Sequence, residues 1–117
     1  MFTSSGHAVV HRFATACRAG SADAVRSLLT REVVAVTDGG GQVVTAGRIQ
    51  GPGEVARCVT ELIGPGVALT VEAVNGQSGV VLRTAGRVVA VVSLQVTGGK
   101  VAAVWIVLNP DKLRHWE

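Results

Sequence analysis

Asp38 is the residue with the clearest capacity for chemistry, because three glycines follow it directly. A carboxylate at the mouth of an apolar cavity has a raised pKa and can abstract a proton next to a carbonyl group. The alternative is a turn-initiating aspartate that accepts hydrogen bonds from the amides of its own loop. We expect Gly39, Gly40 and Gly41 to form a tight corner. We favour a turn or interaction role for Asp38 over a catalytic one.

A second polar segment directly follows the last apolar run of the chain. It reads Asn109, Pro110, Asp111, Lys112, Leu113. Because proline prevents a strand from continuing, one interpretation is a strand terminator followed by a short cap on the sheet. The other is that this segment forms a composite surface with the Asp38 loop. The presence of both segments in one chain favours the composite surface.

Four further side chains could line a cavity if their strands direct them inward. They are Arg48, Glu72, Arg83 and Trp105. Strand parity in the sequence does not decide which of them face inward. A proton-abstracting enzyme also needs a hydrogen-bond donor for the enolate oxygen, a role that tyrosine can fill. The chain contains no tyrosine, which weakens the enzymatic interpretation.

Other chemically suggestive spacings are not supported by their neighbours. His7 and His11 share one helical face, but no further ligand follows at a metal-binding spacing, so no metal site is expected. Neither glycine-rich stretch, 39–41 or 51–53, has the flanking residues of a phosphate-binding loop. No cofactor is predicted.

Composition and charge indicate a folded domain. Of 117 residues, 48% are hydrophobic and 16% charged. The net charge is +3, but the arginines are dispersed and aromatic residues make up only 3%, so direct nucleic-acid binding is not expected.

No apolar run reaches the ~20 residues that span a bilayer. The first residues lack the pattern of a secretory signal, so we expect a cytoplasmic protein without membrane contact. Cys17 and Cys58 fall on apolar stripes and are predicted to be buried thiols.

Apolar spacing predicts three helices in the first half of the chain. The first covers 7–19, the second 22–30, and the third begins at 51–53 and ends before residue 64. Between the second and third helices, 32–37 is typical of a strand, and 42–46 could be its hairpin partner.

The second half predicts four strands joined by short turns, at 67–74, 79–84, 87–97 and 100–108. Such short connections require antiparallel neighbours, so these strands form a meander. Because the helices are segregated from the sheet, the fold class is α+β. Three helices packed on a curved antiparallel sheet leave a cone-shaped cavity.

The last two strands suggest a covered outer face. On one of them, the residues expected to share a face are Val88, Ala90, Val92, Leu94 and Val96. On the last strand, one face carries Ala102, Val104, Ile106 and Leu108, and the other Val101, Ala103, Trp105 and Val107. An antiparallel sheet with one wet face alternates apolar and polar residues. Since the last strand is apolar on both faces, we predict a homodimer through the outer face.

The order of elements resembles the nuclear transport factor 2-like fold, a cystatin-like cone, in its SnoaL-like branch. More narrowly, segments 38–41 and 109–113 resemble the two motifs of a SnoaL-like domain. That domain forms the C-terminal extension of certain extracytoplasmic-function RNA polymerase sigma factors. The resemblance implies a single domain over 1–117, with a flexible terminus at 1–6 and a C-terminal tail at 109–117.

The resemblance also implies a function. In that family the two motifs contact the sigma core and tune its activity on RNA polymerase, and the helical regions that bind polymerase and promoter precede the domain. We therefore expect a regulatory or ligand-sensing domain that acts through protein contacts in transcription regulation. The implied partners are a sigma-factor core or an RNA polymerase component, and a small apolar ligand. The alternative is a small isomerase or polyketide-cyclase-like enzyme with Asp38 as general base.

Overall fold

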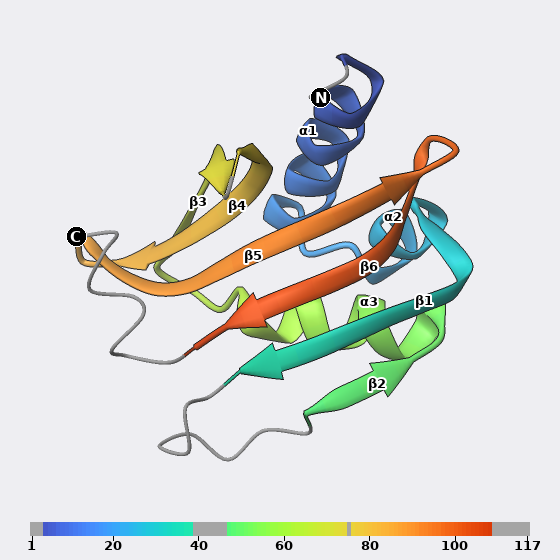
Figure 1. Ribbon diagram of the computed structural model, residues 1–117. Helices are drawn as coiled ribbons and strands as arrows, with labels where there is room; N and C mark the ends of the chain where they lie inside the picture. The colour runs from blue at the N-terminus through green and yellow to red at the C-terminus, as the bar shows by residue number, and fades with distance from the viewer. Residues whose placement is uncertain (1–3, 39–46, 75, 109–117) are drawn as a thin grey trace.

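A mixed β-sheet with three helices packed on one of its faces makes up the computed structural model, which describes residues 4–38, 47–74 and 76–108 (Figure 1). The helices are α1 (Ser4–Arg18), α2 (Ala22–Ser27) and α3 (Pro52–Leu62). The strands are β1 (Leu29–Asp38), β2 (Arg48–Gln50), β3 (Val67–Val74), β4 (Gln77–Thr84), β5 (Arg87–Thr97) and β6 (Lys100–Val107). No helix in this described part is long and apolar enough to cross a bilayer.

The six strands lie in the order β2-β1-β6-β5-β4-β3. The predicted meander from β3 to β6 is confirmed, and each of its neighbouring pairs is antiparallel. The prediction of a wholly antiparallel sheet is wrong, because β1 pairs with β6 in parallel. These two strands are separated by most of the chain, so no short turn fixes their relative direction.

The second helix is shorter than the predicted range 22–30. Ser21 caps its start, where its hydroxyl accepts a hydrogen bond from the N–H of Ala24 at 3.1 Å. Beyond its end, the carbonyl of Leu28 accepts from the N–H of Val101 at 2.7 Å, and Leu29 pairs with Val101 in the sheet. Pairing with β6 therefore takes Leu29 and Thr30 out of the helix.

The N-terminal residues and the β2 strand also differ from expectation. Helix α1 begins at Ser4, so residues 4–6, which we expected to be flexible, form its first turn. The strand paired with β1 is Arg48–Gln50. The predicted hairpin partner at 42–46 lies outside the described residues.

The core lies between the three helices and one face of the sheet. The predicted stripe of α1 is buried, with Phe13 only 1% exposed. From the sheet, Val80, Leu82, Val104 and Ile106 belong to the same apolar cluster, and none is more than 1% exposed. The helix-covered face is thus defined by the side chains that pack against α1, α2 and α3. The opposite face is called the outer face below.

Two β-bulges shift the predicted strand parity. Opposite Leu82 and Arg83, β5 carries one extra residue, so Val88 pairs with Arg83 and joins a small second apolar cluster with Val81 and Val91. The expectation that Val88 shares a face with Ala90 is therefore wrong. The second bulge lies on β6, where Ala103 pairs with Gln95 of β5 but Val101 pairs with the next residue, Val96. Val101 therefore enters the main core together with Val104 and Ile106. The predicted alternation of Val101 with Val104 is wrong for the same reason.

Candidate functional site

The two motif-bearing segments start from adjacent points of the sheet. The N–H of Leu108 donates to the carbonyl oxygen of Asp38 at 2.7 Å, and Asp38 pairs with Val107 in the parallel ladder. On the other side of β1, the N–H of Thr37 donates to the carbonyl of Gly47 at 2.7 Å. The chain therefore leaves β1 and β6 side by side, at the end of the sheet where β2 begins. The motif residues 39–41 and 109–113 lie outside the described residues.

A small apolar cavity lies on the helix-covered side of this same end of the sheet. It measures about 100 Å³. Its lining residues are Ala35, Thr37, Gly47, Ile49, Cys58, Leu62, Ile106 and Leu108. Of these, Thr37, Gly47 and Leu108 also make the backbone contacts that hold the strand ends together. The cavity therefore borders the backbone from which both motif segments start.

The cavity is small, and its described lining has little capacity for acid–base chemistry. Pockets for drug-sized ligands measure about 300–1,000 Å³, whereas a cavity of about 150 Å³ holds benzene. The described lining includes one hydroxyl and one thiol, but no carboxylate, imidazole, guanidinium or phenol. This volume suits a ligand of a few heavy atoms and not a steroid or polyketide.

Asp38 lies on the other side of the sheet from this cavity. Side chains alternate along a strand, and Ala35 and Thr37 line the cavity. Asp38 therefore shares the outer face with Val36, whose partner on β6 is the exposed Trp105. Among the described residues, the cavity lining therefore has no carboxylate at the position suggested for a catalytic base.

The four side chains proposed for the pocket also lie on the outer face. Arg48 pairs with Val36, which in turn pairs with Trp105. Glu72 and Arg83 occupy the outer-face positions of β3 and β4. None of the four lines this small cavity, whereas Glu72 lines a second hollow beside β3. The reason is that the apolar residues between them pack on the helices, and this fixes the parity of each strand.

Around Trp105 the outer face is a mostly apolar surface with a polar border. Trp105 is 53% exposed, and its cross-strand neighbours are Val36 on β1 and Ser93 on β5. Further along the same face, Val34 pairs with Ala103, and both are half-buried. The described residues thus present an exposed indole surrounded by small apolar side chains.

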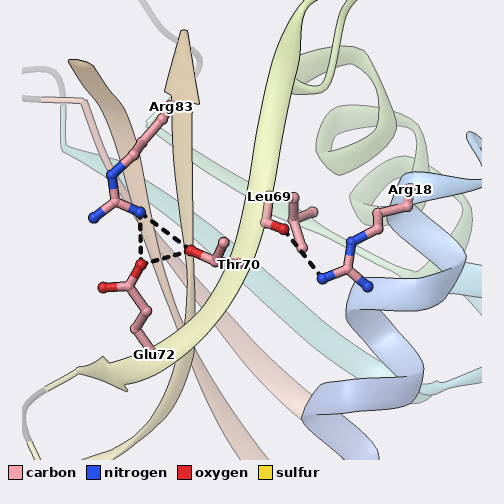
Figure 2. A network of polar contacts seen from close by, with 5 residues as sticks. All are labelled: Arg18, Leu69, Thr70, Glu72 and Arg83. Carbon is pink, nitrogen blue, oxygen red and sulfur yellow. Dashed lines mark hydrogen bonds and ion pairs between the residues drawn. The ribbon is translucent and has the colours of Figure 1, made fainter. Parts of the chain in front are cut away.

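An ion pair crosses the outer face at the other edge of the sheet. The guanidinium of Arg83 donates to Glu72 Oε2 at 2.6 Å and to Thr70 Oγ1 at 3.2 Å, and Thr70 donates to the same carboxylate oxygen at 2.5 Å (Figure 2). The hydrogen bond from Arg83 lowers the pKa of Glu72, and that from Thr70 lowers it further. Arg83 and Glu72 lie on either side of the Thr70–Val81 pair. The network therefore holds β3 and β4 together, and its carboxylate stays ionised.

Neither cysteine is an activated nucleophile. Burial raises the pKa of Cys17 to about 12. Burial also raises the pKa of Cys58, and the charge of Glu61 raises it further. Both thiols are free, so the prediction of buried thiols holds for Cys17, while Cys58 is half-buried at the cavity.

Sequence reasoning missed a second hollow, between α1 and β3. It measures about 310 Å³, and its lining residues are His7, Val71, Glu72, Ala73, Gly76, Gln77 and Ser78. His7 Nδ1 lies 2.8 Å from Ser78 Oγ, and the His7 and His11 rings meet edge to face at 4.3 Å. Within the described ranges, no group of three His, Cys, Asp or Glu side chains could hold a metal ion. No local pattern in the sequence could have located this hollow, because His7 and Ser78 lie 71 positions apart.

Comparison with known proteins confirms the resemblance to the SnoaL-like domain of sigma factors. The chain is 37% identical over 119 aligned positions to the ECF RNA polymerase sigma factor SigJ of Mycobacterium tuberculosis. The alignment covers 89% of this chain and 38% of SigJ. The crystal structure of SigJ superposes with a TM-score of 0.77 at 31% identity, over 96% of this chain and 45% of that one. The chain thus spans less than half the length of this relative. No protein-family model matches the chain.

Other solved structures share the fold at lower identity. A candidate ketosteroid isomerase from Kribbella flavida superposes with a TM-score of 0.66 at 23% identity, over 90% of this chain and 78% of that one. An NTF2-like protein of unknown function from Burkholderia xenovorans superposes with a TM-score of 0.65 at 16% identity, over 97% of this chain and 93% of that one. The chain therefore has the nuclear transport factor 2-like α+β fold. At these identities the likeness concerns the fold alone.

Proposed function

We propose that this domain is a regulatory module of transcription that acts through protein contacts. The contact surface is the end of the sheet at which β1 and β6 terminate side by side. The observation that carries the proposal is the hydrogen bond from Leu108 N–H to the Asp38 carbonyl, because it brings the starting points of the two motif segments together. The 37% identity to a part of SigJ supports a sigma-factor core as the partner.

The cavity beneath this surface supplies a means of regulation. A small apolar molecule that entered it would contact Thr37 and Leu108, whose backbones hold the two strand ends. Burial of apolar surface stabilises such binding at about 25 cal/mol per Å². A ligand would then favour one arrangement of the strand ends over another and so change the affinity for the partner.

Two observations favour this function over the isomerase or cyclase alternative. The cavity formed by the described residues, at about 100 Å³, is smaller than the cavity of about 150 Å³ that holds benzene, and Asp38 lies on the opposite side of the sheet. The likeness to the isomerase-like structure, at 23% identity, concerns the fold alone. The regulatory interpretation needs neither a large cavity nor a buried carboxylate.

A second copy of the chain is the proposed partner of the outer face. Trp105 and its half-buried neighbours Val36, Val34 and Ala103 form the apolar centre, and Arg48, Gln50 and Gln95 lie around it on the same face. An apolar centre with a polar rim is the usual anatomy of a protein interface. This surface lies on the same side of the sheet as Asp38, so dimerisation and sigma-core binding would influence one another.

A pull-down tests the proposed function. The immobilised domain is incubated with a purified sigma core from an extracytoplasmic-function sigma factor, and the bound core is measured by densitometry across a concentration series. Asp38→Ala and Lys112→Ala are each expected to weaken retention by about tenfold, the effect of truncating one of the few contact residues that dominate an interface. Glu61→Ala on α3 and Lys100→Ala at the opposite end of β6 are the matched controls. Unchanged retention by both test variants would contradict the proposal.

A further inference from the structure

A small apolar cluster is buried on the outer face of the sheet, the side on which the structure describes no helix. It consists of Val74, Val81, Val88 and Val91, each at most 5% exposed, with Val107 packed against them, and is called the outer cluster below. Helices α1, α2 and α3 all lie on the opposite face of the sheet (Figure 1). Apolar side chains on an uncovered sheet face stay in contact with water. A further part of the molecule therefore covers these valines.

The polar network on the outer face accounts for only part of this cover. Arg83 donates to Glu72 on β3, so the ion pair lies beside Val81 on β4 (Figure 2). Val88 and Val91 lie on β5, on the other side of β4 from this contact. The guanidinium is directed away from them, so their cover comes from elsewhere.

The outer cluster begins where the chain leaves β6. Val107 pairs with Val91, and Val91 pairs with Val81, so the three side chains form one row across the outer face. In the next row, Trp105 is 53% exposed and its partner Ser93 is half-buried. Along β5 and β6, the cover is thus limited to the end at which the chain leaves β6.

We infer that residues 109–117 fold back across the outer cluster and pack Leu113 and Trp116 on it. This segment directly follows Leu108, and Pro110 within it prevents β6 from continuing. Neighbouring strands lie about 4.8 Å apart, so the distance from β6 to β4 is about 10 Å, whereas an extended segment of this length reaches about 30 Å. Leu113 and Trp116 are its large apolar side chains, which suits them to an apolar surface.

This docking gives the C-terminal segment a role beyond contact with a partner. Asp38 pairs with Val107, so the docked segment holds residues 109–113 on the side of the sheet that carries Asp38. A segment that is already anchored loses less conformational freedom when a partner binds. The docking is a property of this chain alone and does not rest on the proposed function.

Tryptophan fluorescence of the whole chain tests the inference. The chain has two tryptophans, so in the Trp105→Phe variant the emission comes from Trp116 alone. Acrylamide quenching then measures how accessible this indole is to solvent. We expect a quenching constant at least about threefold below that of N-acetyltryptophanamide, because a packed indole is removed from water.

A substitution in the outer cluster locates the docking site. In the same background, Val91→Ser should raise the quenching constant of Trp116 by at least about twofold, because it removes apolar contact area. Val89→Ser, on the same strand at a residue that is already 39% exposed, is the matched control and should leave the constant unchanged. Circular dichroism checks the fold of each variant. If Val91→Ser does not fold, Leu113→Ser replaces it with the same expected result.

Three outcomes would overturn the proposal. The first is quenching of Trp116 as strong as that of N-acetyltryptophanamide, and the second is protection that Val91→Ser and Leu113→Ser both leave intact. The third is protection that is lost on dilution, because it would assign the cover to a second copy of the chain. No sigma core is present in these measurements, so docking can fail while Lys112→Ala still weakens sigma-core retention, and the reverse.

Discussion

The N–H of Leu108 donates to the carbonyl oxygen of Asp38 at 2.7 Å. This contact joins the last residue of β1 to the residue directly after β6, although the two lie 70 positions apart in the sequence. It makes one end of the sheet the common base of two polar segments. The side chain of Asp38 is thereby fixed on the outer face, away from the cavity lined by Leu108.

The position of Asp38 predicts the outcome of an enzymatic test. We expect the wild-type chain and Asp38→Asn to enolise a small ketone at the same rate, equal to that of buffer. The reason is that the carboxylate lies on the opposite side of the sheet from the cavity. Exchange of the ketone's α-hydrogens for deuterium, followed by NMR, measures the rate. A wild-type rate above buffer that Asp38→Asn abolishes would restore the enzyme alternative.

At Gly79, we expect any side chain larger than hydrogen to destabilise the sheet. A Cβ there would lie 2.6 Å from Val74 Cγ2 and 2.7 Å from the Val92 carbonyl oxygen, and this backbone oxygen belongs to a central strand. Overpacking of this kind costs about 1–3 kcal/mol, so Gly79→Ala should lower the free energy of unfolding by that amount. Urea denaturation measures it.

Gly53 in α3 is the matched control for Gly79. A Cβ there meets nothing within 4 Å, and the position lies in the first turn of the helix. Gly53→Ala should therefore raise the free energy of unfolding by about 0.5–1 kcal/mol, because alanine is the better helix former. Equal effects of the two substitutions would contradict the packing described for Gly79.

The buried thiol of Cys17 predicts a loss of stability at alkaline pH. Its pKa is raised from 9.0 to about 12, so the unfolded chain releases this proton at a lower pH than the folded one. The stability associated with Cys17 is complete below pH 9.0 and is lost as the pH rises toward about 12. The slope is about 1.4 kcal/mol per pH unit. For each pH unit within this window, the free energy of unfolding of wild type should fall by about this amount more than that of Cys17→Ala. Urea denaturation at each pH measures the difference.

Because of Glu72, we expect the stability of the fold to depend on pH in the acidic range. Its pKa is lowered from 4.5, first by the hydrogen bond from Arg83, so the carboxylate contributes stability above pH 4.5. That contribution is lost as the pH falls through the lowered folded pKa. The melting temperature of wild type should exceed that of Glu72→Gln near neutral pH, and the difference should shrink below pH 4.5. Because the pair is exposed, the difference is small and decreases with added salt. A constant difference across the acidic range would contradict this.

Trp105 predicts the oligomeric state. We expect a homodimer by size-exclusion chromatography with light scattering, and we expect Trp105→Ser to raise the dimer dissociation constant by at least about tenfold. Because the indole is 53% exposed, the substitution should leave folding intact. Val89→Ser, at the other exposed large apolar residue among those described, is the matched control. A monomeric wild type at micromolar concentration would overturn the proposed dimer.

Local patterns in the sequence determined the helices and the meander. The buried stripe that contains Phe13 in α1 follows from spacing within a single helix, and the strands β3 to β6 pair in chain order because their turns are short. The two motif segments likewise identified the family resemblance without any coordinates. These features depend on interactions between residues that are close in the chain, so the sequence displays them directly.

Only the tertiary structure decided which face each strand residue occupies. The parallel pairing of β1 with β6, the bulge at Val88 and the shortened α2 all depend on contacts between distant segments. A shift of one residue moves a side chain to the opposite face, so parity cannot be read until the packing against the helices is known. This is why Asp38 and Trp105 lie on the outer face, and why the contact of Arg18 with β3 has no signature in the order of elements.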